Sequence, residues 1–386
     1  MKEVDMVSNP FKPSAGHLPP ILIGRETILA DFNEALEDGP GAPGRLMRVT
    51  GPRGVGKTVM LAEFSNTVKA LGWQVIAETA RKDIVQRLIE RLQPVKGNFR
   101  FTIDPSISVM GVGGSLGGVS YEKQHHIVDL SDALAIRLDE LDKKNSGLLV
   151  TIDEAQSIER DDLTEIATAV QNMTIAHRNI AFVFAGLPSM ASKWLNNEAT
   201  TFIRRAQYEP LGEVPLEEVS EALRDTFQDT GLWLDGDPLH VATQATAGYP
   251  FMIQLVGYHI WRNANRRRNG ETEAFAVTDA DVRSGISSAL TRLGDTVHGP
   301  ELDGLSPVDK TYLLAMAQDD GPSSTSVIAE RMGKDVRYAS RYRARLLEAQ
   351  VIVEKGYGWV DFAVPYLREY LREHAAYVRM TSSEEG

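Results

Sequence analysis

Eight consecutive residues in the first sixth of the chain have the types and spacing needed to bind phosphate. They match the pattern G-x-x-x-x-G-K-[S/T] and are Gly51, Pro52, Arg53, Gly54, Val55, Gly56, Lys57 and Thr58. The glycines let the backbone curl until its N–H groups converge on phosphate oxygens, and Lys57 adds a cation at the β- and γ-phosphates. Thr58 supplies a hydroxyl ligand for Mg²⁺. The alternative, a glycine-rich turn with a chance lysine, does not explain why a strand and a helix are predicted on either side.

A second element can hold the metal ion and arrange a water molecule. The apolar run Leu148–Glu154, LLVTIDE, ends in two carboxylates. We expect Asp153 to hold Mg²⁺ through water and Glu154 to orient and polarise the attacking water. The alternative is a pair of acids that cap the following helix, which would make their coincidence with the phosphate-binding motif accidental. This segment resembles a Walker B element.

The elements that position these residues alternate between strands and helices. Apolar runs predict strands, and three- and four-residue spacing of apolar side chains predicts the helices between them. The predicted strands are 45–51, 73–79, 148–154, 180–186 and 206–212. We therefore expect an α/β fold, a doubly wound parallel sheet, over residues 21–212. A β-hairpin insertion is predicted at 99–122; its five glycines do not have the spacing G-x-G-x-x-G.

The remaining chain divides at glycine, proline and aspartate residues into further predicted units. These units are an extended N-terminal arm (1–20), an α-helical lid (213–298), a winged-helix domain of three helices and two strands (301–378) and a disordered tail (379–386).

Composition sets limits on function. A length of 386 residues suits two or three domains of about 100–200 residues. The net charge of −12 makes the molecule as a whole repel polyanions, so nucleic acid would have to bind at a local basic patch. The absence of cysteine excludes disulfides and thiolate metal sites. We find neither a signal-peptide pattern nor a membrane-spanning apolar run, and expect a cytoplasmic protein with no membrane partner.

These motifs together resemble a known family. The phosphate-binding loop, the sequence DEAQ at 153–156, a buried strand ending at Gly186, the triplet Gly248-Tyr249-Pro250 and the winged helix are similar to AAA+ and STAND-type P-loop ATPases. Bacterial and archaeal ATPases related to origin-recognition initiators are the most similar, over residues 20–378. The resemblance implies ATP as the nucleotide, with Arg25 near the adenine and Pro250 also at the nucleotide.

The resemblance also implies a role for one of two arginines. Arg204 or Arg205 lies where AAA+ proteins place an arginine finger, which would act in its own chain or in a neighbouring copy. The alternative is a surface pair at a helix end. The chain departs from the family in two places. The fourth strand ends without the usual polar residue, for which Ser189 and Gln156 are candidates, and no arginine precedes Arg262 after Pro250. Both departures lead us to expect slow hydrolysis that serves as a conformational switch.

A basic segment in the predicted winged helix suggests a partner. Residues 331–345 contain six basic residues and one acidic residue, and Arg337, Arg341 and Arg345 recur at roughly one face of a predicted helix. This helix could contact duplex DNA. The alternative is a signalling or scaffold ATPase in which the winged helix packs internally and the partner is another protein or a second copy of the chain.

Overall fold

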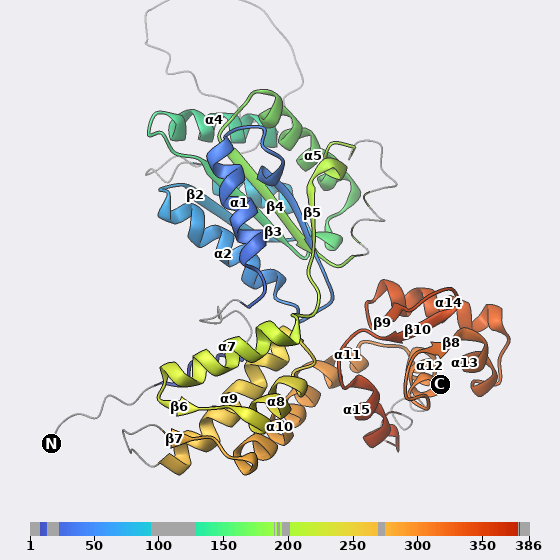
Figure 1. The fold of residues 1–386 in the computed structure, drawn as a ribbon. Helices are drawn as coiled ribbons and strands as arrows, with labels where there is room; N and C mark the ends of the chain where they lie inside the picture. Colours follow the sequence, from blue (N-terminus) through green and yellow to red (C-terminus); the bar gives the residue numbers. More distant parts are fainter. Residues whose placement is uncertain are drawn as a thin grey trace, which may run out of the picture.

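The computed structural model describes residues 8–13, 23–93, 129–188, 190, 194, 201–268, 275–376 and 378. They form an α/β domain, a helical domain below it and a smaller C-terminal domain beside the helical one (Figure 1). The hairpin predicted at 99–122 and the tail predicted at 379–386 lie outside the described residues, and of the predicted arm only 8–13 is described.

The α/β domain is built on one parallel sheet. The described strands are β1 (Leu46–Thr50), β2 (Gln74–Thr79), β3 (Leu148–Asp153), β4 (Ile180–Gly186) and β5 (Gln207–Pro210). Their order is β2-β3-β4-β1-β5, with Thr50 opposite Gly186 and Thr79 opposite Asp153. Because the strands are parallel, the loop after β1 and the carboxylates after β3 meet at the same edge of the sheet. The parallel α/β sheet predicted from the sequence is confirmed.

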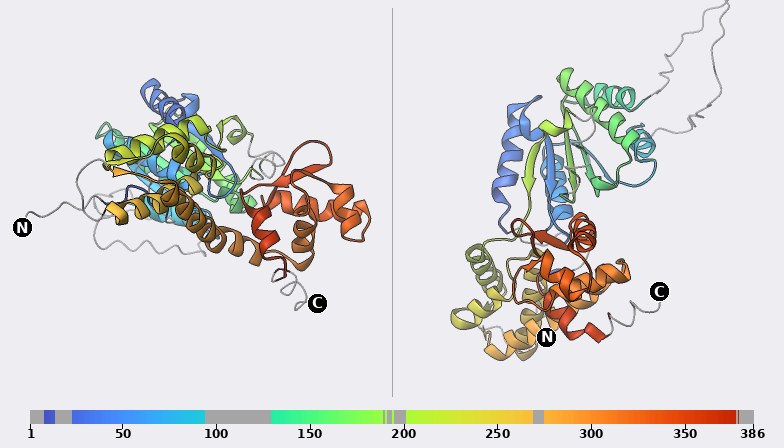
Figure 2. Two further views of the ribbon diagram at one scale, coloured as in Figure 1. Left: turned by 60° about the horizontal axis from the view of Figure 1, so that its bottom comes forward. Right: turned by 90° about the vertical axis from the view of Figure 1, so that its right-hand side faces the viewer.

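Helices cover both faces of this sheet, as Figure 2 shows in its right-hand view. One face packs against α1 (Glu26–Asp38) and α2 (Lys57–Ala70). The other packs against α3 (Ile84–Leu92), α4 (Leu130–Asp142) and α5 (Arg160–Ile175). All seven residues of β4 are buried, which explains why its sequence is continuously apolar instead of alternating.

The helical domain shares its core with one face of the sheet. Its helices are α7 (Leu216–Asp229), α8 (Gly236–Gln244), α9 (Pro250–Arg268) and α10 (Asp279–Leu293), and two short strands, β6 (Leu232–Trp233) and β7 (Phe275–Ala276), pair in parallel. Leu211, Val214 and Tyr249 belong to the same buried cluster as Val49 of β1. The apolar core therefore runs without interruption from the sheet into the helical domain.

The described part of the N-terminal arm packs on the helical domain. Phe11 is 2% exposed, and its ring lies over Gly257 of α9 and 5.5 Å from the ring of Phe227. The amide of Asn9 donates to the Tyr258 carbonyl. Residues 8–13 thus lie on α9, where glycine at 257 leaves room for an aromatic ring.

The C-terminal domain combines helices with a small sheet. Its elements are α12 (Pro307–Met316), β8 (Ser323–Ser324), α13 (Thr325–Arg331), α14 (Val336–Glu348), β9 (Ile352–Glu354), β10 (Trp359–Phe362) and α15 (Leu367–Glu373). The strands pair antiparallel in the order β8-β10-β9. The three helices and two strands that the sequence predicts are present; β8 and α15 are additional.

A π-helical turn lies between the helical domain and the C-terminal domain. Helix α10 continues through Gly294–His298 into α11 (Gly299–Asp303). Turns of this kind are rare and often occur at functional sites. The imidazole of His298 is 1% exposed, and its Nε2 lies 3.0 Å from the Pro365 carbonyl oxygen. Burial lowers the pKa of His298 to about 4. Nearby, the Tyr366 hydroxyl donates to the Ala245 carbonyl and ties the C-terminal domain to the end of α8.

Acidification is expected to destabilise this joint through His298. The unfolded chain binds a proton near the ordinary histidine pKa of 6.5, whereas the folded chain does so only near pH 4. Stability is therefore present above pH 6.5 and is lost as the pH falls toward 4, by about 2 kcal/mol at about pH 5. Urea unfolding of wild type and His298→Gln at neutral and acidic pH measures this. A difference between the two proteins that stays constant with pH would contradict it.

Candidate nucleotide site

The predicted phosphate-binding loop lies between β1 and α2. Gly54 and Gly56 have φ of +76° and +93°, a left-handed conformation that favours glycine, and α2 begins at Lys57. The side chain of Lys57 is nearly buried, and its Nζ donates to the carbonyls of Gly51 (2.8 Å) and Pro52 (2.7 Å). Burial lowers the pKa of Lys57, while the nearby Glu154 and Asp153 oppose that shift. The loop and its lysine thus form a cationic cradle at a helix N-terminus.

The two carboxylates of β3 face this loop. The Thr58 hydroxyl donates to Asp153 Oδ2 at 2.6 Å, and the backbone N–H of Glu154 donates to Asp153 Oδ1 at 2.8 Å. A hydroxyl and a carboxylate side by side are oxygen donors of the type that Mg²⁺ prefers. The residues present therefore fit the metal ion that the motif implies, and Thr58 and Asp153 are the side chains that would hold it.

Gln156 links the carboxylate of Glu154 to the neighbouring strand. Its side-chain amide donates to Glu154, and its Oε1 accepts a hydrogen bond of 3.0 Å from the Leu187 N–H at the end of β4. Of the two residues that we considered for the missing polar group of the fourth strand, Gln156 reaches that strand end. Ser189 lies outside the described residues.

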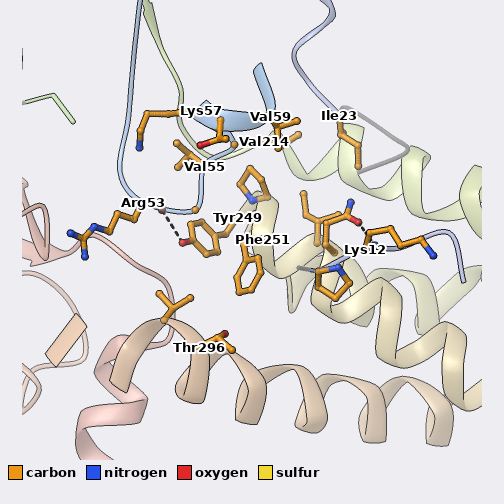
Figure 3. Close-up of a pocket in the computed structure, with 18 of the residues that line it drawn as sticks. Lys12, Ile23, Arg53, Val55, Lys57, Val59, Val214, Tyr249, Phe251 and Thr296 are labelled. Carbon is orange, nitrogen blue, oxygen red and sulfur yellow. Dashed lines mark hydrogen bonds between the residues drawn. The ribbon is translucent and has the colours of Figure 1, made fainter. Parts of the chain in front are cut away.

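A cavity of about 680 Å³ opens in front of the loop and lies between it and the helical domain (Figure 3). The loop residues 53–58, Glu154, Arg25 and Pro250 line it, as do Ile23, Val214 and Ile253. The Arg25 guanidinium donates to the Gly212 carbonyl at 2.6 Å, and burial lowers its pKa. The structure thus brings the predicted loop, Glu154, Arg25 and Pro250 around one cavity, which apolar side chains also line.

Tyr249 connects the helical domain directly to the loop. Its hydroxyl donates to the Arg53 carbonyl at 2.8 Å, drawn as a dashed line in Figure 3. Burial raises the pKa of this tyrosine. A Cβ atom at Gly54 would lie 1.8 Å from the tyrosine oxygen, so only glycine fits beneath the ring. The triplet predicted from the sequence therefore contacts the loop through its middle residue as well as lining the cavity through Pro250.

Residues from α10, the π-helical turn and α11 complete the cavity and were missed by the sequence reasoning. Arg292, Thr296 and Glu301 line it, although their sequence showed only the spacing of ordinary helices. The side chain of Glu301 is 4% exposed and lies 3.8 Å from the guanidinium of Arg53. Burial raises the pKa of Glu301 to about 7, and Arg53 opposes the shift. An acidic group therefore lies beside the phosphate-binding loop.

The two candidate finger arginines lie elsewhere. Arg204 and Arg205 belong to a short 3₁₀ turn, Ile203–Arg205, that precedes β5. The Arg204 carbonyl accepts a hydrogen bond from Arg48 of β1. Neither arginine is among the residues that line the described cavity of its own chain. A finger role for Arg204 or Arg205, in its own chain or in a neighbouring copy, therefore stays a prediction.

Comparisons with known proteins place this fold. Residues 21–183 match the family model described as an AAA ATPase domain. The first domain is of the AAA ATPase type. The C-terminal residues 295–371 match a model described as a domain of unknown function, DUF8462, whereas no match was found among curated proteins.

Solved structures resemble nearly the whole chain, beyond the AAA domain. One is the ORC2 protein of Aeropyrum pernix, in ADPNP and ADP complexes, at 15% identity and a TM-score of 0.63, covering 96% of this chain and 98% of that one. Another is a Walker-type ATPase of Pyrococcus abyssi, at 19% identity and a TM-score of 0.62, covering 96% and 99%. These likenesses establish an AAA+ fold of the type found in origin-recognition proteins.

The basic helix α14 uses some of its cations within its own domain. Arg343 pairs with Glu354, and Arg345 lies 3.0 Å from Asp309, whose side chain is 2% exposed. Arg337 and Arg341 are exposed and form no ion pair with any described residue. Of the three arginines predicted to share one face, Arg345 thus has an internal partner, and two remain directed to solvent.

Arg345→Ala is expected to destabilise the C-terminal domain. It leaves the buried Asp309 carboxylate without its cation, at a cost of about 1–2 kcal/mol, because Arg345 itself is half exposed. The exposed Arg341→Ala is the control and should change stability by less than about 0.5 kcal/mol. Thermal unfolding of both variants tests this; equal midpoints would show that the pair contributes nothing.

Proposed function

We propose that the protein binds ATP with Mg²⁺ and hydrolyses it slowly, as a conformational switch. The observation that carries the proposal is the joint geometry of Lys57, Thr58, Asp153 and Glu154 at one edge of the sheet, facing a cavity covered by the helical domain. The A. pernix relative was solved with ADPNP and ADP, which supports an adenine nucleotide in this cavity.

The residues divide the reaction between them. The loop N–H groups would hold the β- and γ-phosphates together with Lys57, once its Nζ no longer donates to the carbonyls of Gly51 and Pro52. Thr58 and Asp153 would hold Mg²⁺, which neutralises charge on the phosphates when bound. Glu154 would accept a hydrogen bond from a water whose oxygen attacks the γ-phosphorus. The bond between that phosphorus and the β–γ bridging oxygen breaks, and ADP and inorganic phosphate leave.

Two features support slow turnover. Gln156 already occupies the carboxylate of Glu154, so this hydrogen bond has to be exchanged before Glu154 can orient water. The start of α9, where the family resemblance leads us to expect an arginine, instead supplies Pro250 and Phe251 to the cavity. The arginine that the helical domain contributes to the cavity is Arg292 of α10. A switch can tolerate a low rate because its output is the conformation held while ATP is bound.

For the C-terminal domain we propose a winged helix, with α12, α13 and α14 as its helices and β9 and β10 as the wing. The preceding helix α11 reaches the loop through Glu301, and the C-terminal domain reaches the helical domain through Tyr366. Closure of the helical domain on ATP would therefore move the C-terminal domain as well. The partner that responds to this switch is either DNA or another protein.

Exposed side chains of the C-terminal domain favour DNA as the binding partner. Arg337 and Arg341 lie on the outer face of α14, and Tyr357 and Trp359 are exposed on the hairpin between β9 and β10. Arginines can bind phosphates and guanine edges, and exposed aromatic rings can pack on sugars or bases. In a chain with net charge −12, such a patch is local and suits a specific site better than general coating of DNA. A protein partner on this face is the competing outcome.

Two substitutions test the nucleotide site. Lys57→Ala should lower ATP affinity at least about 100-fold, because it removes the cation of the cradle. Glu154→Gln should bind ATP normally yet reduce turnover about 100-fold or more. Calorimetric titration and phosphate release measure the two effects. Unchanged ATP affinity in Lys57→Ala would remove the loop from the site, and wild-type turnover in Glu154→Gln would remove Glu154 from the reaction.

DNA binding is tested by Arg337→Ala/Arg341→Ala. Loss of two phosphate contacts should weaken duplex binding and reduce the slope of log affinity against log salt by about 2. The matched control is Arg262→Ala/Arg266→Ala on α9, which changes net charge equally at another exposed surface. Fluorescence anisotropy across a salt series separates the outcomes. Equal losses in both double variants, or no DNA affinity in the wild type, would favour a protein partner.

A further inference from the structure

Arg53 of the phosphate-binding loop contacts later parts of the chain through both its backbone and its side chain. The backbone carbonyl of Arg53 accepts the hydrogen bond from Tyr249, at the start of α9. Its guanidinium lies 3.8 Å from Glu301 of α11, beyond the π-helical turn. Figure 3 shows the Arg53 side chain pointing away from Tyr249. The helical part and the C-terminal part of the molecule thus both contact this loop residue.

The Glu301 side of this contact is incompletely satisfied. Both carboxylate oxygens are buried, and neither has a hydrogen-bond partner among the described residues. No cluster of three or more histidine or acidic residues occurs in the described part of the chain that could place a metal ion there. A buried carboxylate without hydrogen bonds is costly, so its main compensation is the cation of Arg53.

Arg53 is in turn close to the phosphate cradle. It lines the same cavity as Gly56, Lys57 and Glu301, and its positive charge is one of the causes, after burial, that lower the pKa of Lys57. The Arg53 side chain is 62% exposed, which leaves it free to turn from Glu301 toward an anion on the loop. The terminal phosphate of a triphosphate carries the charge that would attract it.

We propose that Glu301 competes with the terminal phosphate for the Arg53 guanidinium and thereby sets how strongly the site prefers a nucleoside triphosphate over a diphosphate. This inference rests on the proposed nucleotide site and adds a specificity residue from the C-terminal part of the chain. When Arg53 turns to a triphosphate, Glu301 loses its counter-charge, and the docked position of α11 becomes less favourable. With a diphosphate, Arg53 stays with Glu301, and α11 stays docked. Binding of the third phosphate is thus coupled to release of the C-terminal domain.

The test compares nucleotide affinities in variants in which a charged side chain is replaced by a neutral amide. Dissociation constants for ADP and for a non-hydrolysable ATP analogue, each with Mg²⁺ at about pH 8, are measured by calorimetry. Glu301→Gln should raise the preference for the triphosphate about fivefold or more, a typical lower limit for such coupling. Arg53→Gln, at an exposed side chain, should lower it by a similar factor. Asp303→Asn, an exposed acid on the same helix, is the matched control and should leave the preference unchanged.

A double variant shows whether Glu301 acts through Arg53. In an Arg53→Gln background, Glu301→Gln should have little further effect on the preference, because the shared partner is gone. An unchanged preference in either single variant, or the same effect of Glu301→Gln with and without Arg53, would overturn the proposal while nucleotide binding itself persists. Absence of binding in the wild type would instead reject the nucleotide site, and the inference with it.

Discussion

The parallel pairing of β1 with β4, and of β4 with β3, is the constraint on which the rest of the molecule depends. Thr50 lies opposite Gly186, and Ile152 lies opposite Phe184, so all three strands end at one edge. That alignment carries the loop after β1 to the carboxylates after β3. The hydrogen bond between Thr58 and Asp153 is its direct consequence. A shift in register would separate two groups that are 95 residues apart in sequence.

A continuous core passes this geometry to the rest of the chain. Because Val214 and Tyr249 share a buried cluster with Val49, the helical domain cannot move freely over the sheet. Tyr249 then adds a polar contact to the loop itself. In turn, the C-terminal domain reaches the site through α11. Movement of either part is thereby coupled to the conformation of the loop residues that it contacts.

Electrostatics in this acidic protein depends on which charges find partners when it folds. The six basic residues of 331–345 suggest a single cationic surface, yet Arg343 and Arg345 pair with acids of their own domain. Glu301, by contrast, is a buried acid that lies beside the phosphate-binding loop, 3.8 Å from Arg53. Neither arrangement follows from net charge, because each depends on which side chains the fold brings within a few ångströms.

The phosphate-binding loop, the carboxylates at 153–154, the five strands and most helices could be predicted from the sequence, because loop conformation and apolar periodicity are local properties. The family resemblance also placed Pro250 of the triplet 248–250 at the nucleotide, and this residue lines the cavity. Tyr249's contact with Arg53, Gln156's link to β4 and the approach of Glu301 were decided only by tertiary structure. Arg53 and Glu301 are separated by most of the chain, and the spacing of residues in a helix does not reveal which distant group its buried face will meet.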